Sequence, residues 1–102
     1  MTNLDQMFQQ IEDLEGDLIA LEQALVRIPS VNTGFMPTGD ETPVCKYISD
    51  WLSKAGIESE ILESSPNRGN IIANIDGTSG KLGLLFMSHT DVVPVEDEDK
   101  WT

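Results

Sequence analysis

A stripe of apolar residues at the start of the chain most constrains its fold. The stripe recurs three and four positions apart: Leu4, Met7, Ile11, Leu14, Leu18, Leu21, Leu25 and Ile28. This spacing places the side chains along one side of an α-helix. Thr2 or Asn3 can cap the start, and Pro29 ends the helix because the residue before a proline is pushed out of helical dihedral angles. The pattern predicts one long helix over residues 4–28.

The same stripe also matches the seam of a coiled coil, in which two copies of the helix would pack together. The flanking positions carry Glu, Asp and Gln, with almost no Lys or Arg before Arg27. A parallel dimer would bring these like charges together, which favours a helix packed against its own domain. A non-enzymatic interaction module that dimerises through residues 4–28 is the alternative interpretation.

A second helix is expected after a loop rich in turn-forming residues. This loop covers residues 29–41 and contains Pro and Gly at several positions. Apolar residues then return at helical spacing from Val44 to Ala55, and Pro43 stands where the first helical residue tolerates a proline. Gly56 is a natural terminator of this helix.

Three short apolar segments follow the second helix, at residues 57–63, 70–75 and 82–87. Turn-forming residues at 76–80 predict that the third segment returns antiparallel to the second. The third segment is almost continuously apolar, which is typical of a strand buried on both faces. The expected fold is therefore α/β, with two helices followed by a three-stranded mixed sheet.

The charge of the chain limits its partners. Its 102 residues include 18 Asp and Glu against 6 Lys and Arg, which gives a formal net charge of −12. A polyanion repels phosphate backbones and anionic lipid surfaces, so we expect no nucleic-acid partner and no membrane partner. No apolar run approaches the ~18 residues that a membrane helix needs, and no secretory signal is visible at the start. We expect a cytoplasmic protein, in which a single cysteine forms no internal disulfide.

The clearest candidate site follows the third predicted strand, where the only histidine of the chain is found. His89 and Asp91 are two positions apart, so on an extended chain their side chains point to the same side. A metal-bound imidazole usually donates its other N–H to a carboxylate or carbonyl group, which fixes the tautomer of the ring. The spacing alone leaves open whether His89 binds a metal or is a polar residue at a strand end, with Asp91 capping the next turn.

Four segments resemble the M20 metallopeptidase family. Residues 82–94 (LGLLFMSHTDVVP) are similar to the first metal motif of the family. Upstream, residues 27–32 (RIPSVN) resemble its "IPSV" segment, residues 39–41 (GDE) resemble the opening of its second helix, and residues 68–73 (RGNIIA) resemble one of its strands. The order and spacing of the motifs agree from about Leu14 to Trp101, which makes the resemblance specific.

The resemblance implies roles for two residues. His89 matches the first zinc ligand of the family, and Asp91 matches the aspartate that orients this histidine and counts as a catalytic residue. Family members hold two zinc ions in a complete site, and cobalt is a possible substitute. Their remaining ligands and their general base come later in the sequence than this motif.

The resemblance also implies an activity. Family members are zinc-dependent hydrolases of amide bonds in N-acyl amino acids or small peptides, and they form homodimers through a separate domain. Residues 1–102 would then be the N-terminal portion of a zinc-hydrolase catalytic domain, incomplete and without the dimerisation domain. We expect a truncated chain of this kind to be inactive alone.

Overall fold

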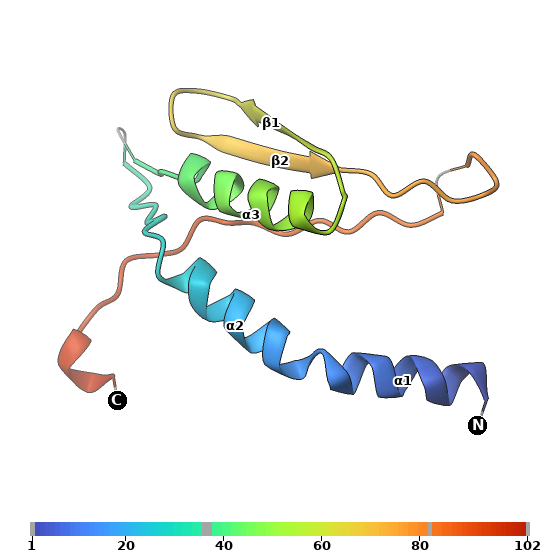
Figure 1. Cartoon of the computed structure of the whole chain (residues 1–102). Helices are drawn as coiled ribbons and strands as arrows, with labels where there is room; N and C mark the ends of the chain where they lie inside the picture. Colours follow the sequence, from blue (N-terminus) through green and yellow to red (C-terminus); the bar gives the residue numbers. More distant parts are fainter. Residues whose placement is uncertain (1, 36–37, 82, 102) are drawn as a thin grey trace.

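The computed structural model describes residues 2–35, 38–81 and 83–101 of the chain (Figure 1). The elements, in chain order, are α1 (Asn3–Asp13), α2 (Glu15–Val26), α3 (Thr42–Lys54), β1 (Ser59–Glu63), β2 (Gly69–Ala73) and the short 3₁₀ helix η1 (Glu98–Lys100). In Figure 1, α1 and α2 form an arm that extends away from a unit made of α3 and the hairpin β1–β2. We call residues 3–26 the N-terminal arm.

The single long helix predicted over residues 4–28 is wrong, because the chain forms two helices there. Thr2 caps α1 in a reciprocal arrangement: its hydroxyl accepts from the backbone N–H of Asp5 at 3.1 Å, and the Asp5 carboxylate accepts from the backbone N–H of Thr2 at 2.9 Å. At Leu14 the helix is interrupted by a single turn residue (φ −89°, ψ −1°), whose N–H bonds to the carbonyl of Ile11 at 3.1 Å. Gly16, two positions on, is a poor helix former, which favours an interruption of the helix at this point.

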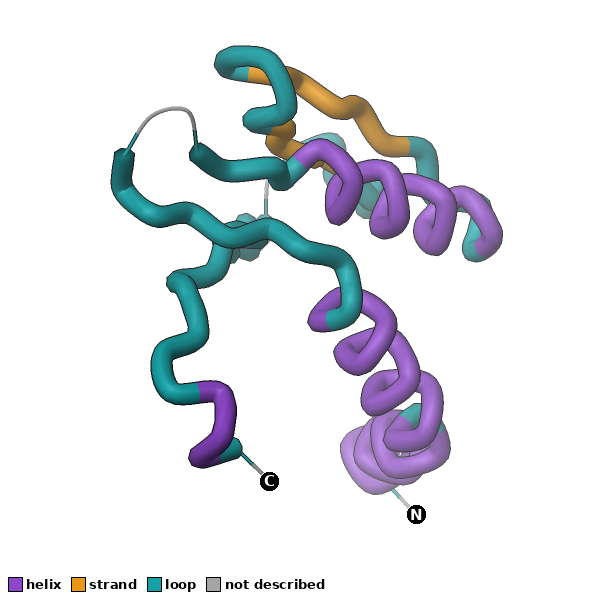
Figure 2. The backbone as a smooth tube through the Cα atoms, turned by 90° about the vertical axis from the view of Figure 1, so that its left-hand side faces the viewer, coloured by secondary structure: helices purple, strands orange, loops and turns teal. Residues whose placement is uncertain are grey.

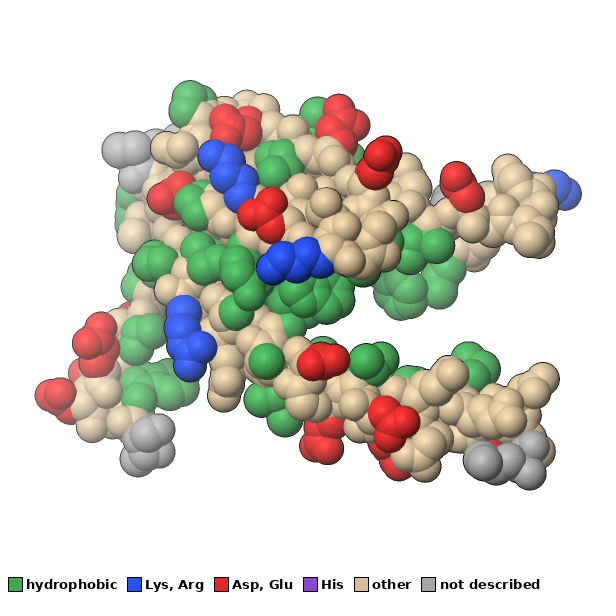
Figure 3. Space-filling model, in the orientation of Figure 1, with side chains coloured by type: hydrophobic (Ala, Val, Ile, Leu, Met, Phe, Trp, Pro, Cys, Tyr) green, Lys and Arg blue, Asp and Glu red, His purple; other side chains and the backbone are tan. Residues whose placement is uncertain are grey.

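Most of the apolar stripe of the N-terminal arm does not pack against the rest of the chain, contrary to the prediction, and only its end, at Leu21 and Leu25, is half-buried. Neither α1 nor α2, whose residues the structure describes in full, contains a buried residue. Large apolar side chains of the arm are half or more exposed: Leu4, Met7, Phe8, Ile11, Leu14, Leu18 and Ile19. Figure 3 shows hydrophobic side chains on the arm and on the side of the hairpin unit that faces it.

The core of the hairpin unit lies where α3 packs on β1 and β2. Val44 and Cys45 are buried there, in the first turn of α3. Thr42 is also buried, and its hydroxyl donates to the Glu63 carboxylate at 2.8 Å. Gly69 lets the strand approach the helix closely, because a Cβ atom at this position would lie 2.8 Å from the Thr42 hydroxyl oxygen. The fit between α3 and β2 therefore depends on the absence of a side chain at Gly69.

An ion pair joins two of the segments that carry the family resemblance. The Nε atom of Arg68 lies 2.9 Å from a carboxylate oxygen of Glu41, which is buried before the start of α3. The Arg68 guanidinium also approaches the backbone carbonyl of Thr38 at 3.4 Å. Gly39 makes room for this side chain, because a Cβ atom there would lie 2.6 Å from the Arg68 Nε atom, and its φ of +80° suits glycine. The loop before α3 is thereby attached to the turn between β1 and β2.

The third predicted strand is not part of the sheet, which has two strands in the described residues. β1 and β2 pair antiparallel, whereas residues 83–91 run as extended chain without a ladder to β2 (Figure 2). Leu82 lies outside the described residues. Leu84, Leu85, Phe86 and Met87 are 66–86% exposed. An apolar segment becomes a strand only where a neighbouring strand supplies backbone partners, and the apolar pattern alone does not specify that neighbour.

An isolated parallel bridge instead connects this segment to the loop after α2. Val31 pairs with Val92: the Asn32 N–H donates to the Val92 carbonyl at 2.7 Å, and the Val92 N–H donates to the Ser30 carbonyl at 3.0 Å. The buried Ser30 also donates its hydroxyl proton to the carbonyl of Thr90 at 2.8 Å. We call these three hydrogen bonds the 30–92 bridge.

Over the described ranges, none of the helices is both long and apolar enough to cross a membrane.

Candidate active site

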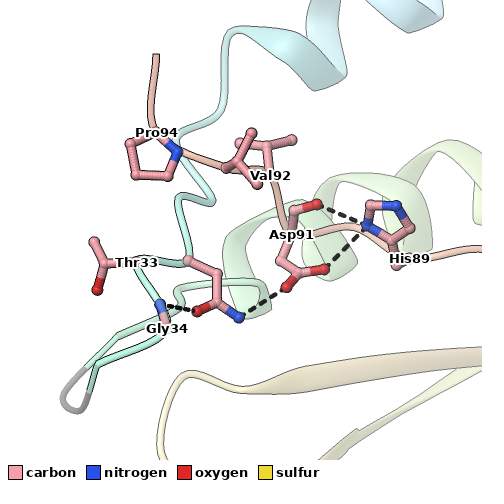
Figure 4. Close-up of a pocket in the computed structure, with 8 residues that line it drawn as sticks. Thr33, Gly34, His89, Asp91, Val92 and Pro94 are labelled. Atoms are coloured by element: carbon pink, nitrogen blue, oxygen red, sulfur yellow. Dashed lines mark hydrogen bonds and ion pairs between the residues drawn. The ribbon is translucent and has the colours of Figure 1, made fainter. Parts of the chain in front are cut away.

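His89 and Asp91 lie against each other at the segment that carries the 30–92 bridge (Figure 4). The Nδ1 atom of His89 is 3.0 Å from the Oδ1 atom of Asp91 and 2.8 Å from the main-chain carbonyl oxygen of Asp91. A carbonyl and an ionised carboxylate can only accept, so Nδ1 carries the proton and donates to both. In the neutral ring, the Nε2 atom on the far side then keeps its lone pair, and the side chain is 84% exposed.

The second carboxylate oxygen of Asp91 is held by a residue distant in sequence. The side-chain amide of Asn32 donates to the Oδ2 atom of Asp91 at 2.9 Å across 59 positions. This hydrogen bond, and to a smaller extent the contact with His89, hold the pKa of Asp91 below its ordinary value, although partial desolvation acts in the opposite direction. The Asp91 side chain, 31% exposed, therefore stays ionised between its two partners.

Asn32 itself is fixed by the turn that follows it. Its side-chain oxygen accepts from the backbone N–H of Gly34 at 2.9 Å. Sequence reasoning placed Asn32 only in the segment that resembles the family and did not identify it as a site residue. The sequence carries only a weak signal for this role, because the pattern of residues 27–32 does not indicate that this loop contacts residues 90–92.

The pair lies at the edge of an open pocket of about 420 Å³. Its lining includes Asn32, Thr33 and Gly34 from the loop after α2, and His89, Asp91 and Pro94 from the extended segment (Figure 4). The pocket therefore forms where two segments distant in sequence meet, and the 30–92 bridge holds these segments together.

The chemistry of this pair suits one ligand of a metal ion. An imidazole with one nitrogen fixed by a carboxylate and the other free is the usual arrangement of a zinc-binding histidine. A catalytic zinc ion takes three protein ligands and a water molecule. Within residues 2–35, 38–81 and 83–101, however, no group of three or more His, Cys, Asp or Glu side chains is close enough to hold a metal ion. His89 thus fits as a single ligand, with Asp91 as the residue that orients it.

Comparison with known proteins finds similar enzymes, which include desuccinylases and deacetylases. The chain is 36% identical over 88 residues to a probable succinyl-diaminopimelate desuccinylase of Staphylococcus epidermidis, a match that covers 86% of this chain and 20% of the relative. It is 39% identical over 88 residues to a succinyl-diaminopimelate desuccinylase of Methylorubrum extorquens, covering 82% and 21%. It is 41% identical over 63 residues to an acetylornithine deacetylase of Vibrio cholerae, covering 62% and 16%.

These relatives are named as hydrolases, a desuccinylase and a deacetylase. They are members of the M20 family, and they confirm the resemblance predicted from the motifs: the chain is similar to an N-terminal fragment of an M20 metallohydrolase. The chain spans about a fifth of the length of the curated relatives it matches. No family model matches the chain. No solved structure matches it either.

Proposed function

We propose that this chain contributes one side of the active site of a zinc-dependent hydrolase that cleaves amide bonds in N-acyl amino acids or small peptides. The contact between His89 and Asp91 is the observation that carries the proposal, because it leaves Nε2 of an exposed imidazole available to a metal ion. The similarity to a desuccinylase and a deacetylase supports the choice of an amide as the scissile bond.

Each of the two residues has a separate role in this proposal. His89 would hold one of two zinc ions through Nε2, and Asp91 would keep the ring oriented through Nδ1. Bound zinc would activate a water molecule and polarise the substrate carbonyl, and cobalt is a possible substitute. The other metal ligands and the general base would come from residues outside this chain. A chain of this length alone would then be inactive.

The partners of such an enzyme follow from the same proposal. The substrate would be a small molecule, and an intact enzyme would be a homodimer in the cytoplasm. The net charge of −12 supports the expectation that neither nucleic acid nor a membrane surface is a partner.

The test compares the 102-residue chain with a longer protein in which it is followed by the remaining segments of the Staphylococcus epidermidis relative. Release of free amine from N-succinyl and N-acetyl amino acids is measured with added zinc or cobalt. We expect turnover only by the longer protein, because loss of a general base alone typically costs about 10²–10⁴ in rate. In the longer protein, His89→Ala should abolish turnover, whereas Asn70→Ala, on an exposed position of β2, should preserve it.

Two results would contradict the proposal. Turnover by the 102-residue chain that is abolished by a chelator and by His89→Ala would show that the chain is active alone. Full turnover by the longer protein carrying His89→Ala would show that His89 is not a metal ligand.

Asp91→Asn should lower turnover less than Asp91→Ala if Asp91 only orients the ring, because an amide oxygen still accepts the Nδ1 proton.

The exposed stripe of the N-terminal arm favours a second function, an interaction module that dimerises through residues 4–28. The break at Leu14 counts against a continuous coiled coil along the whole stripe. Light scattering over a concentration series distinguishes the two functions. A mass that doubles with concentration, and does not double in a variant with Leu4 and Ile11 changed to Ser, would support the module.

A further inference from the structure

Asn32 lines the site, and its side-chain contacts have no role in the proposed function. We propose that Asn32 is a positioning residue that holds the Asp91 carboxylate toward His89 and so fixes the imidazole as the Nδ1–H tautomer. The consequence for metal binding rests on the proposed function, but the tautomer itself does not.

Both polar atoms of the Asn32 side-chain amide form hydrogen bonds. The amide nitrogen donates to the Oδ2 atom of Asp91 at 2.9 Å, and the amide oxygen accepts from the backbone N–H of Gly34 at 2.9 Å. The Gly34 N–H can only donate and the carboxylate can only accept, so exchanging the two ends of the amide would break both bonds. The turn at Gly34 therefore decides that the NH₂ group, and not the oxygen, faces Asp91.

The backbone holds Asn32 in this place. Its N–H donates to the carbonyl of Val92 at 2.7 Å, and the Val92 N–H donates to Ser30 on the other side of Val31. Because the backbones on both sides are already paired, the side-chain bond between Asn32 and Asp91 orders only a short side chain and costs little conformational entropy.

Fixing one carboxylate oxygen determines where the other points. With Oδ2 held by Asn32, the Oδ1 atom lies 3.0 Å from the Nδ1 atom of His89. The Asp91 side chain is 31% exposed, so without Asn32 the carboxylate would be free to turn toward water. The main-chain carbonyl of Asp91 also accepts from Nδ1, at 2.8 Å, so removal of Asn32 should weaken one of two acceptors and not both.

The experiment reads the tautomer of the metal-free 102-residue chain by ¹⁵N NMR at alkaline pH, where imidazoles are neutral. The chain has a single histidine, so the imidazole signals need no assignment. Asn32→Asp is the sharpest variant, because it keeps the shape and the acceptor for the Gly34 N–H but removes the donor to Asp91. We expect the ratio of Nδ1–H to Nε2–H to fall about two- to tenfold, as for the loss of one ordinary hydrogen bond. Asn32→Ala should lower it without adding a charge.

The matched control is Asn70→Asp, which adds the same charge on an exposed position of β2 and should leave the ratio unchanged. An unchanged ratio in either Asn32 variant, or an equal fall in the control, would overturn the proposal. The unsubstituted chain provides a measurement that does not depend on whether a variant folds. In this chain the Nδ1–H tautomer should dominate, and a dominant Nε2–H tautomer would also overturn the proposal. None of these readings involves zinc or turnover, so they succeed or fail separately from the proposed function.

Discussion

His89 is the only histidine of the chain, so it is the only residue that could offer an imidazole nitrogen to a metal ion. Its ring is exposed and needs no rearrangement to meet such an ion. Because a catalytic zinc site normally has three protein ligands, we expect the isolated chain to bind zinc weakly. His89→Ala should remove this weak binding in isothermal titration calorimetry, whereas Asn70→Ala should not change it. Tight, stoichiometric binding that survives His89→Ala would contradict the site assignment.

The pKa of Asp91 gives a second prediction at this scale. The hydrogen bond from Asn32, and to a smaller extent His89, depress it in the folded state. A carboxyl group with a depressed folded pKa contributes stability above its ordinary pKa of about 3.9, and this contribution is lost as the pH falls through the depressed value. We expect the ¹³C signal of the Asp91 carboxyl to titrate below the ordinary value, and Asn32→Ala to raise its midpoint. A midpoint at or above the ordinary value in the unsubstituted chain would be inconsistent with the contacts.

These residues also show what the sequence could predict about the site. The contact between His89 and Asp91 follows from their separation of two positions on an extended chain. The contact between Asn32 and Asp91 spans 59 positions and depends on the 30–92 bridge. No local pattern specifies such a long-range pairing, so Asn32 was found only in the structure.

At the scale of elements, the close approach of β2 to α3 gives a mutational test. A Cβ atom at Gly69 would lie 2.8 Å from the hydroxyl oxygen and 3.1 Å from the Cα atom of Thr42. Backbone cannot move aside as a flexible side chain can, so we expect Gly69→Ala to lower the free energy of unfolding by about 1–3 kcal/mol, as for other overpacked contacts. The change is measured by urea denaturation.

Gly77 provides the control for this test, because a Cβ atom at Gly77 would meet nothing within 4 Å. Gly77→Ala should change the free energy of unfolding by less than about 0.5 kcal/mol, as is usual for surface substitutions. Equal losses in both variants would mean that the alanine acts on the chain in general and not on the contact between β2 and Thr42.

The helix α3 and the strands β1 and β2 were predictable because each is specified locally. Helical spacing and Pro43 indicated α3, and the segments at 57–63 and 70–75 overlap β1 and β2. Two predictions, the unbroken first helix and the third strand, were wrong for different reasons. The break at Leu14 depends on the backbone between two regular stretches, which apolar spacing does not report. The third strand lacks a partner in the described residues, and a strand cannot form a ladder on its own.

At the scale of the whole molecule, exposed apolar surface favours association between copies of the chain, and the net charge opposes it. Large apolar side chains are exposed both on the N-terminal arm and over residues 84–87. The net charge of −12 keeps copies apart at low salt, and added salt screens this repulsion. We therefore expect marginal stability and association that increases with sodium chloride, measured by static light scattering. A monomer with a sharp, salt-independent thermal transition would contradict this expectation.

The association test has a matched pair of variants. Replacing Leu85 and Met87 by Ser should reduce salt-induced association, because both side chains are largely exposed. Replacing Val44, which is buried in the first turn of α3, should not reduce this association but should lower the stability of the fold. The matched part of the chain covers only about a fifth of each relative, so we expect an intact enzyme to cover residues 84–87.

We also expect the 30–92 bridge to close after the hairpin unit during folding. The hairpin unit closes over short separations, but Ser30 and Thr90 must meet across 60 positions of chain. Closing a long loop costs entropy that local pairing does not, and the bridge offsets this cost with only a few hydrogen bonds. We therefore expect the hydrogen bond between Asn32 and Asp91 to form last during folding and to be lost first on warming, while α3 and the hairpin are still intact.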